Sequence, residues 1–133
     1  MYLLDTNICI YLIKRKFPHL QVRVQREPLF NIAVSAVTVA ELEFGIAKSL
    51  YPKKNRVLLF SFLSPFKLIA FGPEDAEHFG LIRHDLNRRG TPIGPYDLQL
   101  AAQCQSRDLT LVTNNTKEFE RVPELKLENW TLE

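Results

Sequence analysis

The sequence predicts an α/β fold, with one domain over residues 1–133 in which a central, mainly parallel sheet is flanked by helices on both faces. Short apolar runs typical of buried strands alternate along the chain with longer segments of helical periodicity. This alternation favours parallel pairing, because each helical connection carries the chain back across the sheet. The length also fits one domain, since 133 residues with 46% hydrophobic residues supply a single core.

The first half of the chain contains two expected strands and four expected helices. The apolar run at residues 2–4 ends at Asp5, and this residue and the two after it favour the start of a helix. Prolines delimit the later helices, because Pro18 can open one helix, while Pro52 ends one and permits the next. We therefore expect strands at residues 2–4 and 32–34, and helices at 8–13, 18–24, 37–50 and 53–63.

The second half continues the same alternation. A turn at residues 72–75 leads into an amphipathic helix that Gly90 closes, and Pro95 is well placed to begin another. The next apolar run ends in polar residues, and a last extended piece is expected to be an edge strand. We therefore expect strands at 66–71, 109–112 and 125–130, and helices from the turn to about 89 and over 96–107.

Composition excludes several classes of protein. No stretch approaches the roughly 20 apolar residues of a membrane span, and the chain opens without the basic lead and apolar core of a signal peptide. Cys9 and Cys104 stand in apolar surroundings outside any Cys-x-x-Cys motif, so we expect buried thiols in a reducing compartment. We expect a soluble, cytoplasmic protein without a membrane partner. The net charge of +2 neither requires nor excludes a nucleic-acid partner.

Polar residues follow two of the expected strands. Asp5 and Thr6 come after the first strand, and Thr113 and Asn115 come after the strand at 109–112. Ligands of open parallel sheets bind beyond the carboxyl ends of the strands, so these positions are candidates for a site. For either cluster alone, a helix cap or a turn is the simpler explanation.

Asp97 lies on the same helix face as Leu100, Ala101 and Cys104, so it is expected to face the core. A buried carboxylate without compensation costs several kcal/mol or becomes protonated. The alternative is that Asp97 only complements the helix dipole in the first turn.

The helix expected over residues 37–50 carries one narrow polar stripe that includes Glu41 and Gly45. Most of its other positions are apolar, so we expect it to be largely buried. The helical wheel leaves the choice between Glu41 and Glu43 open. Gly45 favours Glu41 somewhat, because a missing side chain leaves room for another group to approach.

Asp5, Glu41, Asp97 and Asn115 are therefore candidates for one shared cleft. Clustered carboxylates repel one another unless a cation neutralises them. Oxygen ligands without a histidine or cysteine cluster select hard ions, so the expected cofactor is Mg²⁺, with Mn²⁺ as a substitute.

Four segments of the chain resemble those of a known family. The segments are Leu-Leu-Asp-Thr-Asn at 3–7, Thr-Val-Ala-Glu-Leu at 38–42, Gly-Thr-Pro-Ile-Gly-Pro-Tyr-Asp at 90–97 and Leu-Val-Thr-Asn-Asn-Thr-Lys-Glu-Phe at 111–119. In their order and spacing they resemble the PIN-domain ribonucleases, in particular the VapC toxins of bacterial type II toxin–antitoxin pairs, and the likeness runs from Tyr2 to Trp130.

The resemblance implies a single PIN-like domain and a metal-dependent endoribonuclease whose acidic cluster is Asp5, Glu41 and Asp97. Asp5 and Asp97 are the expected direct metal ligands. Many relatives carry a fourth acid after the last central strand, and Asn115 stands at the corresponding place here. The expected reaction is attack by water in line with the leaving oxygen, which leaves a 5′-phosphate and a 3′-hydroxyl.

Other residues are expected to support this chemistry. Thr6 is placed to hold Asp5 or a water, and Thr113 is placed to assist Asn115. Arg88 and Arg89 precede the segment at 90–97 and are candidates for contacts to RNA phosphates, although charge runs are usually solvated surface.

The resemblance also implies partners. A VapB-like antitoxin is expected to cover the cleft with its C-terminal segment and to direct a basic side chain at the carboxylates. The helices between Ile8 and Phe62 would supply its groove and a homodimer face, unless their apolar residues are all core. A larger toxin–antitoxin assembly would contact operator DNA only through the antitoxin. The expected substrate is tRNA, including the anticodon loop of the initiator, so that cleavage inhibits translation.

Three alternatives fit parts of the pattern. A receiver domain needs an acidic pair after the first strand, and an Asp-x-Asp phosphatase needs an acid where Asn7 stands, so both fit poorly. The stronger alternative is a protein that binds RNA or an antitoxin but has lost turnover because Asn115 replaces the fourth acid.

Overall fold

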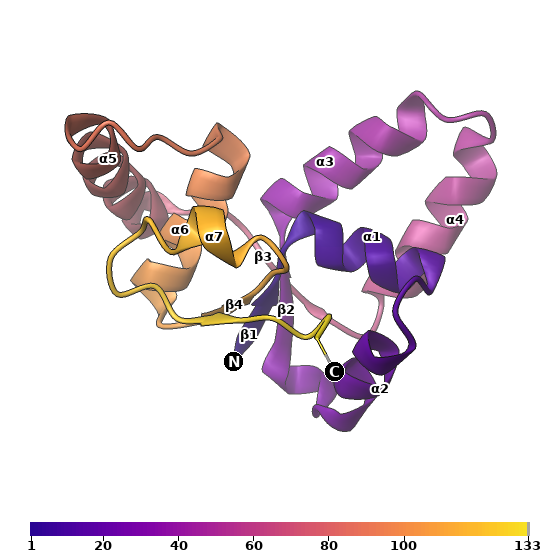
Figure 1. Cartoon of the computed structure of the whole chain (residues 1–133). Helices are drawn as coiled ribbons and strands as arrows, with labels where there is room; N and C mark the ends of the chain where they lie inside the picture. The colour runs from indigo at the N-terminus through magenta and orange to yellow at the C-terminus, as the bar shows by residue number, and fades with distance from the viewer. Residues whose placement is uncertain (133) are drawn as a thin grey trace.

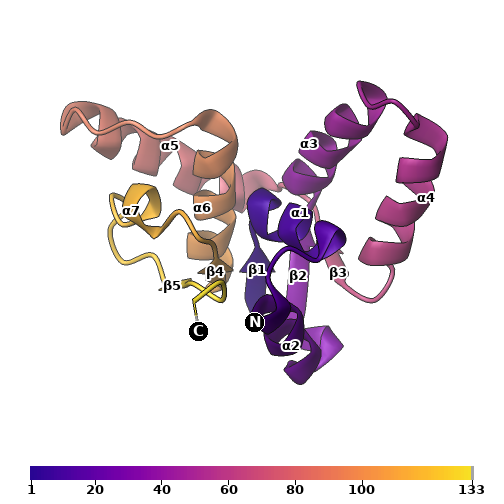
Figure 2. The same ribbon diagram turned by 45° about the vertical axis from the view of Figure 1, so that its right-hand side comes forward.

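The structure is a computed structural model, and it describes residues 1–132. Five strands in this range form one sheet in which every neighbouring pair is parallel, in the order β3-β2-β1-β4-β5 (the whole chain in Figure 1, all five strands labelled in Figure 2). The predicted α/β fold is confirmed. The strands are β1 (Tyr2–Leu4), β2 (Ile32–Ser35), β3 (Lys67–Ile69), β4 (Thr110–Val112) and β5 (Leu127–Glu128).

Helices fill the connections between the strands. They are α1 (Thr6–Lys14), α2 (Pro18–Arg26), α3 (Ala36–Ala47), α4 (Pro52–Leu63), α5 (Pro73–Arg88), α6 (Pro95–Arg107) and α7 (Thr116–Phe119), with a short 3₁₀ turn at Leu29–Asn31. The sequence predicts the first six to within about three residues at each end. It does not predict α7, which is a single turn following β4.

Alternation along the strands divides the core into two layers, one on each face of the sheet. Leu3 packs on one side with residues of α5 and α6, such as Ile82 and Leu100. Leu4 packs on the other side with residues of α1 and α4, such as Ile8 and Leu59. Figure 2 shows these helices on opposite sides of the sheet. Helices cover both faces of the sheet, so polar residues gather at the carboxyl ends of its central strands.

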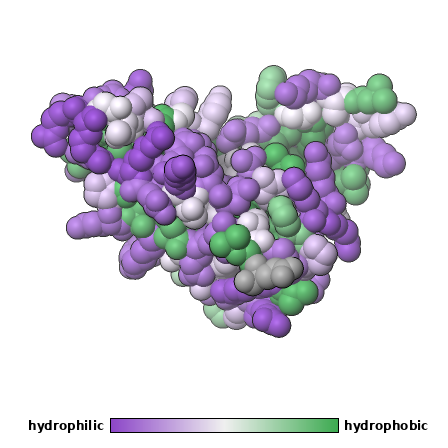
Figure 3. All heavy atoms as spheres, in the orientation of Figure 1, coloured by the Kyte–Doolittle hydropathy of each residue, from purple (hydrophilic) through white to green (hydrophobic). Residues whose placement is uncertain are grey.

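The α3–α4 hairpin extends away from the sheet on one side, and α5 and α6 lie on the other (Figure 1). The expectation of a largely buried α3 is therefore wrong. Its buried residues are Val37, Thr38 and Leu42 near its start, whereas Phe44 is 66% exposed. Figure 3 shows hydrophobic side chains on the surface of this hairpin and mainly hydrophilic ones over α5 and α7. None of the helices in the described range is long and apolar enough to cross a membrane.

Candidate active site

Asp5 lies where β1 ends and α1 begins. Its backbone N–H donates to the carbonyl of Val112 at 3.0 Å, and its Oδ1 accepts from the N–H of Ile8 at 2.8 Å, so Asp5 caps α1. The residue is 4% exposed. Burial raises the pKa of Asp5, hydrogen bonds from Thr113 and Ile8 oppose this, and the charge of Glu41 raises it further. The cap is thus also one member of a group of acids.

Glu41 and Glu43, between which the sequence left the choice open, have different partners in the structure. The Thr6 hydroxyl donates to Oε1 of Glu41 at 2.8 Å and lies 3.1 Å from the hydroxyl oxygen of Thr38, so Glu41 is held on the side of α3 that faces α1. Glu43 instead pairs with Arg56 of α4 at 3.1 Å. Thr6, which the sequence places as a support for the first acid, therefore orients the second one.

Asp97 is the third residue of α6, and its neighbour one turn on, Leu100, is fully buried as expected. Burial, the charge and hydrogen bond of Glu118, and the charges of Asp5 and Glu41 raise the pKa of Asp97 to about 7. A role limited to the helix dipole does not account for this, because the positive end of a dipole would lower the pKa.

Glu118 in α7 supplies a fourth carboxylate that the sequence analysis misses. It lies close enough to Asp97 for its charge to raise the pKa of that carboxyl, and its Oε1 accepts from the N–H of Gly94 at 3.4 Å. Asn115, expected in the place of a fourth acid, lies beside Glu118 and donates from Nδ2 to its Oε2 at 2.7 Å. The Asn-x-x-Glu pattern at 115–118 is typical of a helix N-terminus, and it would have indicated a helical turn carrying this acid.

Thr113 follows β4 and is fully buried. Its Oγ1 accepts from the backbone N–H of Asn115 at 2.9 Å, and its side chain lowers the pKa of Asp5. The hydroxyl therefore holds the turn after β4 and favours the ionised form of Asp5.

Arg88 and Arg89 end α5 and both contact Asp85. Arg88 pairs with Asp85 at 3.1 Å and its side chain is 71% exposed. Arg89 pairs with Asp85 at 2.7 Å and also donates to the carbonyl of Arg121 at 2.7 Å, which ties α5 to the segment after α7. Arg89 thus has a structural contact, while Arg88 extends into solvent.

The donor set of this site fits a hard divalent cation. The charge of Glu118 raises the pKa of Asp97, and a cation held near both carboxylates would relieve that repulsion. Within residues 1–132, none of the four acids forms a salt bridge. In the same range no three His, Cys, Asp or Glu side chains already have the arrangement of a metal site, so binding would require side chains to turn.

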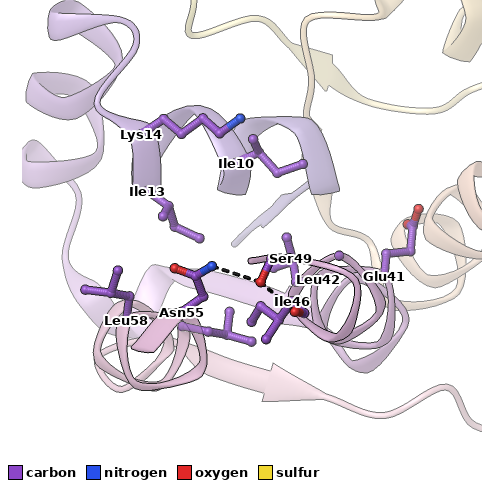
Figure 4. A pocket seen from close by; sticks show the side chains of 11 residues that line it. Ile10, Ile13, Lys14, Glu41, Leu42, Ile46, Ser49, Asn55 and Leu58 are labelled. Carbon is purple, nitrogen blue, oxygen red and sulfur yellow. Dashed lines mark hydrogen bonds between the residues drawn. The ribbon is translucent and has the colours of Figure 1, made fainter. Parts of the chain in front are cut away.

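An apolar groove of about 540 Å³ lies between α1, α3 and α4, with Glu41 at one end (Figure 4). At its far side the amide of Asn55 donates to the hydroxyl of Ser49 at 3.0 Å, which joins α4 to the end of α3. Its apolar walls include Ile10, Ile13, Leu42, Ile46, Leu58 and Leu59.

Comparison with known proteins decides the family. The sequence model of the PIN-domain family matches residues 2–125 of the chain. The chain is 43% identical to ribonuclease VapC2 of Haemophilus influenzae and 40% identical to the tRNA(fMet)-specific endonuclease VapC of Salmonella typhimurium, in both cases over 97% of each chain. The chain belongs to the VapC branch of the PIN-domain family.

Solved VapC structures have the same fold. The chain matches one in the DNA-bound VapBC complex of Salmonella typhimurium with a TM-score of 0.92, 40% identity and 97% of each chain covered. It matches one in VapBC2 of Rickettsia felis, bound to a promoter DNA fragment, with a TM-score of 0.91, 37% identity and coverage of 97% and 98%. The resemblance to VapC proteins that the four sequence segments predict is confirmed.

Proposed function

We propose that this VapC-family chain is the toxin of a type II toxin–antitoxin pair and acts as a divalent-metal-dependent endoribonuclease. The observation that carries the proposal is the convergence of Asp5, Glu41, Asp97 and Glu118 without a basic partner in the described range. The relatives named ribonuclease VapC2 and tRNA(fMet)-specific endonuclease VapC support the same activity.

The four acids divide the work of holding the cation. Asp5 and Asp97 are the proposed direct ligands, while Glu41 and Glu118 complete the negative site from either side. Bound Mg²⁺ or Mn²⁺ would polarise the scissile phosphate and lower the pKa of a water for in-line attack. Thr6 would keep Glu41 in place through its hydrogen bond. Thr113 would support Asp5 by favouring its ionised form. The proposed products carry a 5′-phosphate and a 3′-hydroxyl.

We propose tRNA as the substrate, and the anticodon loop of initiator tRNA as the first target to test. The support is the 40% identity to the tRNA(fMet)-specific endonuclease of Salmonella typhimurium. Cleavage of this tRNA would inhibit translation in the cytoplasm. Arg88 is the better candidate of the two arginines for a phosphate contact, because Arg89 also bonds Arg121.

The proposed partner is a VapB-like antitoxin whose C-terminal segment occupies the groove between α1, α3 and α4. Apolar walls suit the nonpolar face of such a segment, and Glu41 at the end of the groove suits a basic side chain. Similar VapC chains occur in DNA-bound VapBC complexes, so we propose a homodimer within a larger assembly that contacts operator DNA through the antitoxin.

The alternative of a binding protein without turnover depends on the loss of a fourth acid. Glu118 argues against that reason, because its charge acts on Asp97 and it would serve as the fourth acid. Turnover is therefore the function that the geometry supports best.

The experiment compares cleavage of total tRNA by the wild type, Asp5→Asn and Asp97→Asn, with Mg²⁺, with Mn²⁺ and with EDTA. We expect cleavage that EDTA abolishes and that each variant lowers by at least about 100-fold, since both remove a ligand charge. Asp108→Asn is the matched control, because Asp108 is exposed, pairs with Lys126, and has a positive φ that asparagine tolerates.

Undiminished cleavage by both site variants would refute the proposed site. An inactive wild type would favour the binding protein. A 2′,3′-cyclic phosphate at the cut end would rule out attack by water.

A further inference from the structure

The side chain of Asn115 has a contact that its place in the fold does not require. Asn115 is the first residue before α7, where an asparagine side chain commonly accepts from a backbone N–H of the helix. Here it makes no such capping bond. Its Nδ2 instead donates to Oε2 of Glu118 at 2.7 Å. The amide therefore serves the acid and not the helix end.

Asn115 is itself held in place from the core. Its backbone N–H donates to the hydroxyl oxygen of Thr113 at 2.9 Å, and Thr113 is fully buried. The residue between them, Asn114, turns the other way and donates to the hydroxyl of Tyr11 at 3.1 Å. Two adjacent asparagines thus have different partners, one at the acidic cluster and one on α1.

Glu118 depends on this amide for its orientation. Its other contact from a donor, the backbone N–H of Gly94, is long at 3.4 Å. Its remaining neighbour is the carboxyl of Asp97, which repels it whenever both are ionised. A flexible glutamate with those contacts alone would turn toward solvent.

We propose that Asn115 is a positioning residue whose amide turns the carboxylate of Glu118 toward Asp97, so that the two acids accept one divalent cation together. This rests on the proposed nuclease function of the same site. It differs from the expectation that Asn115 replaces a fourth acid as a ligand, because the amide donates to an acid that is already present.

Asn115→Asp separates the two roles by the sign of its effect. If Asn115 were a ligand, an added carboxylate would tighten the binding of Mn²⁺. If Asn115 positions Glu118, the change removes the donor and sets a like charge against the acid, so binding weakens by about tenfold. Asn115→Ala is expected to weaken it similarly. Asn114→Ala is the matched control and is expected to stay within about twofold of the wild type.

Binding of Mn²⁺ by the purified full chain is measured by isothermal titration calorimetry, with thermal unfolding of each variant as a check on folding. In the Glu118→Ala background, Asn115→Ala is expected to cause no further loss of Mn²⁺ affinity, because the residue to be positioned is gone. In carbon NMR spectra of the metal-free protein, the side-chain carboxyl resonance of Glu118 is expected to shift in Asn115→Ala and not in Asn114→Ala. In tRNA cleavage, saturating Mg²⁺ is expected to restore most of the rate of Asn115→Ala.

Tighter Mn²⁺ binding by Asn115→Asp, or unchanged binding by Asn115→Ala, would overturn the proposal, as would a wild type that binds no Mn²⁺. If the Mn²⁺ results hold and the wild type cleaves no tRNA, the nuclease proposal fails while the positioning role of Asn115 stands.

Discussion

Two helices of this protein begin with the same Gly-Pro-x-Asp pattern, and their aspartates differ in almost every other respect. Asp75 of α5 folds back on its own helix, because its Oδ2 accepts from the N–H of Gly72 at 2.8 Å. At the start of α6 the corresponding N–H, that of Gly94, is directed at Glu118. Asp97 is therefore not committed to capping its helix and stands among the other acids.

The charges around the two aspartates differ in the same way. Burial would raise the pKa of Asp75, but hydrogen bonds from Arg107, Gly72 and Ser106 and the charge of Arg107 together lower it. Arg107 stands 2.9 Å from the carboxylate and also bonds the carbonyl of Ala70. The pKa of Asp97 is raised, because burial and the negative charges of the nearby acids both disfavour its ionised form. One local pattern thus gives a structural acid where the chain supplies the cation, and a candidate ligand where it does not.

The largest expected effect on stability comes from the first aspartate. Asp75→Ala is expected to lower the free energy of unfolding by about 2 kcal/mol or more, because it leaves Arg107 without its carboxylate and opens the contact between α5 and α6. Urea unfolding measures this, with Asp85→Ala as the control at a solvent-screened pair, where the loss of stability should be much smaller. The tRNA cleavage rate per folded molecule should not change. Equal stability of Asp75→Ala and wild type would contradict the structural role.

Asp97→Asn is expected to raise the stability relative to the wild type, whereas Asp75→Ala lowers it. In EDTA, the folded wild type binds more protons than the unfolded chain between the ordinary value of 3.8 and the folded pKa of about 7, so its stability falls as pH rises through that range. The asparagine of Asp97→Asn is neutral at every pH, so it adds no such pH dependence to the stability. Thermal unfolding should therefore show Asp97→Asn gaining on the wild type from about pH 4.5 to about pH 7.5. A gap that shrinks with rising pH would contradict the raised pKa.

Added Mg²⁺ sharpens the same comparison. At about pH 7.5 the ion should raise the melting temperature of the wild type, since binding to the folded state alone stabilises it. Asp97→Asn should respond less, because one ligand charge is gone. An equal response of the two proteins would place the bound ion elsewhere.

The smallest expected effect concerns the hydroxyl that orients Glu41. Thr6→Val keeps the shape of the side chain and removes the donor at 2.8 Å from Glu41, so tRNA cleavage should fall by about tenfold. Stability should change by no more than about 1 kcal/mol, because one half-exposed hydrogen bond is lost. Cleavage assays and urea unfolding check both. An unchanged rate would mean that Glu41 needs no support from Thr6.

The positions of Asp5 and Asp97 could be predicted because they depend only on residues close to them in the sequence. Asp5 follows an apolar strand and begins a helix, and Asp97 falls on the apolar face of its own helix. Both inferences need only the neighbouring residues and the fixed periodicity of a strand or helix. The structure places both among acids that lie far apart in the sequence.

Glu41 and Glu118 were harder to predict, because their surroundings come from residues that are distant in the sequence. The wheel of α3 leaves the choice between Glu41 and Glu43 open, and their different partners lie on two neighbouring helices, Thr6 on α1 and Arg56 on α4. Glu118 lies on a helix of four residues, too short for hydrophobic periodicity to reveal. The exposure of Phe44 escaped prediction likewise, since a helix pattern does not tell where the sheet beneath it ends.

The sequence by itself determined the parallel α/β architecture, the family resemblance and the two acids at element ends, because strand and helix periods, prolines and caps act within a few residues. The tertiary structure alone decided which acids lie near one another and which have a basic partner. That decision depends on charges brought together from β1, α3, α6 and α7, and the free energy of a carboxylate is set by whatever lies within a few ångströms of it in space.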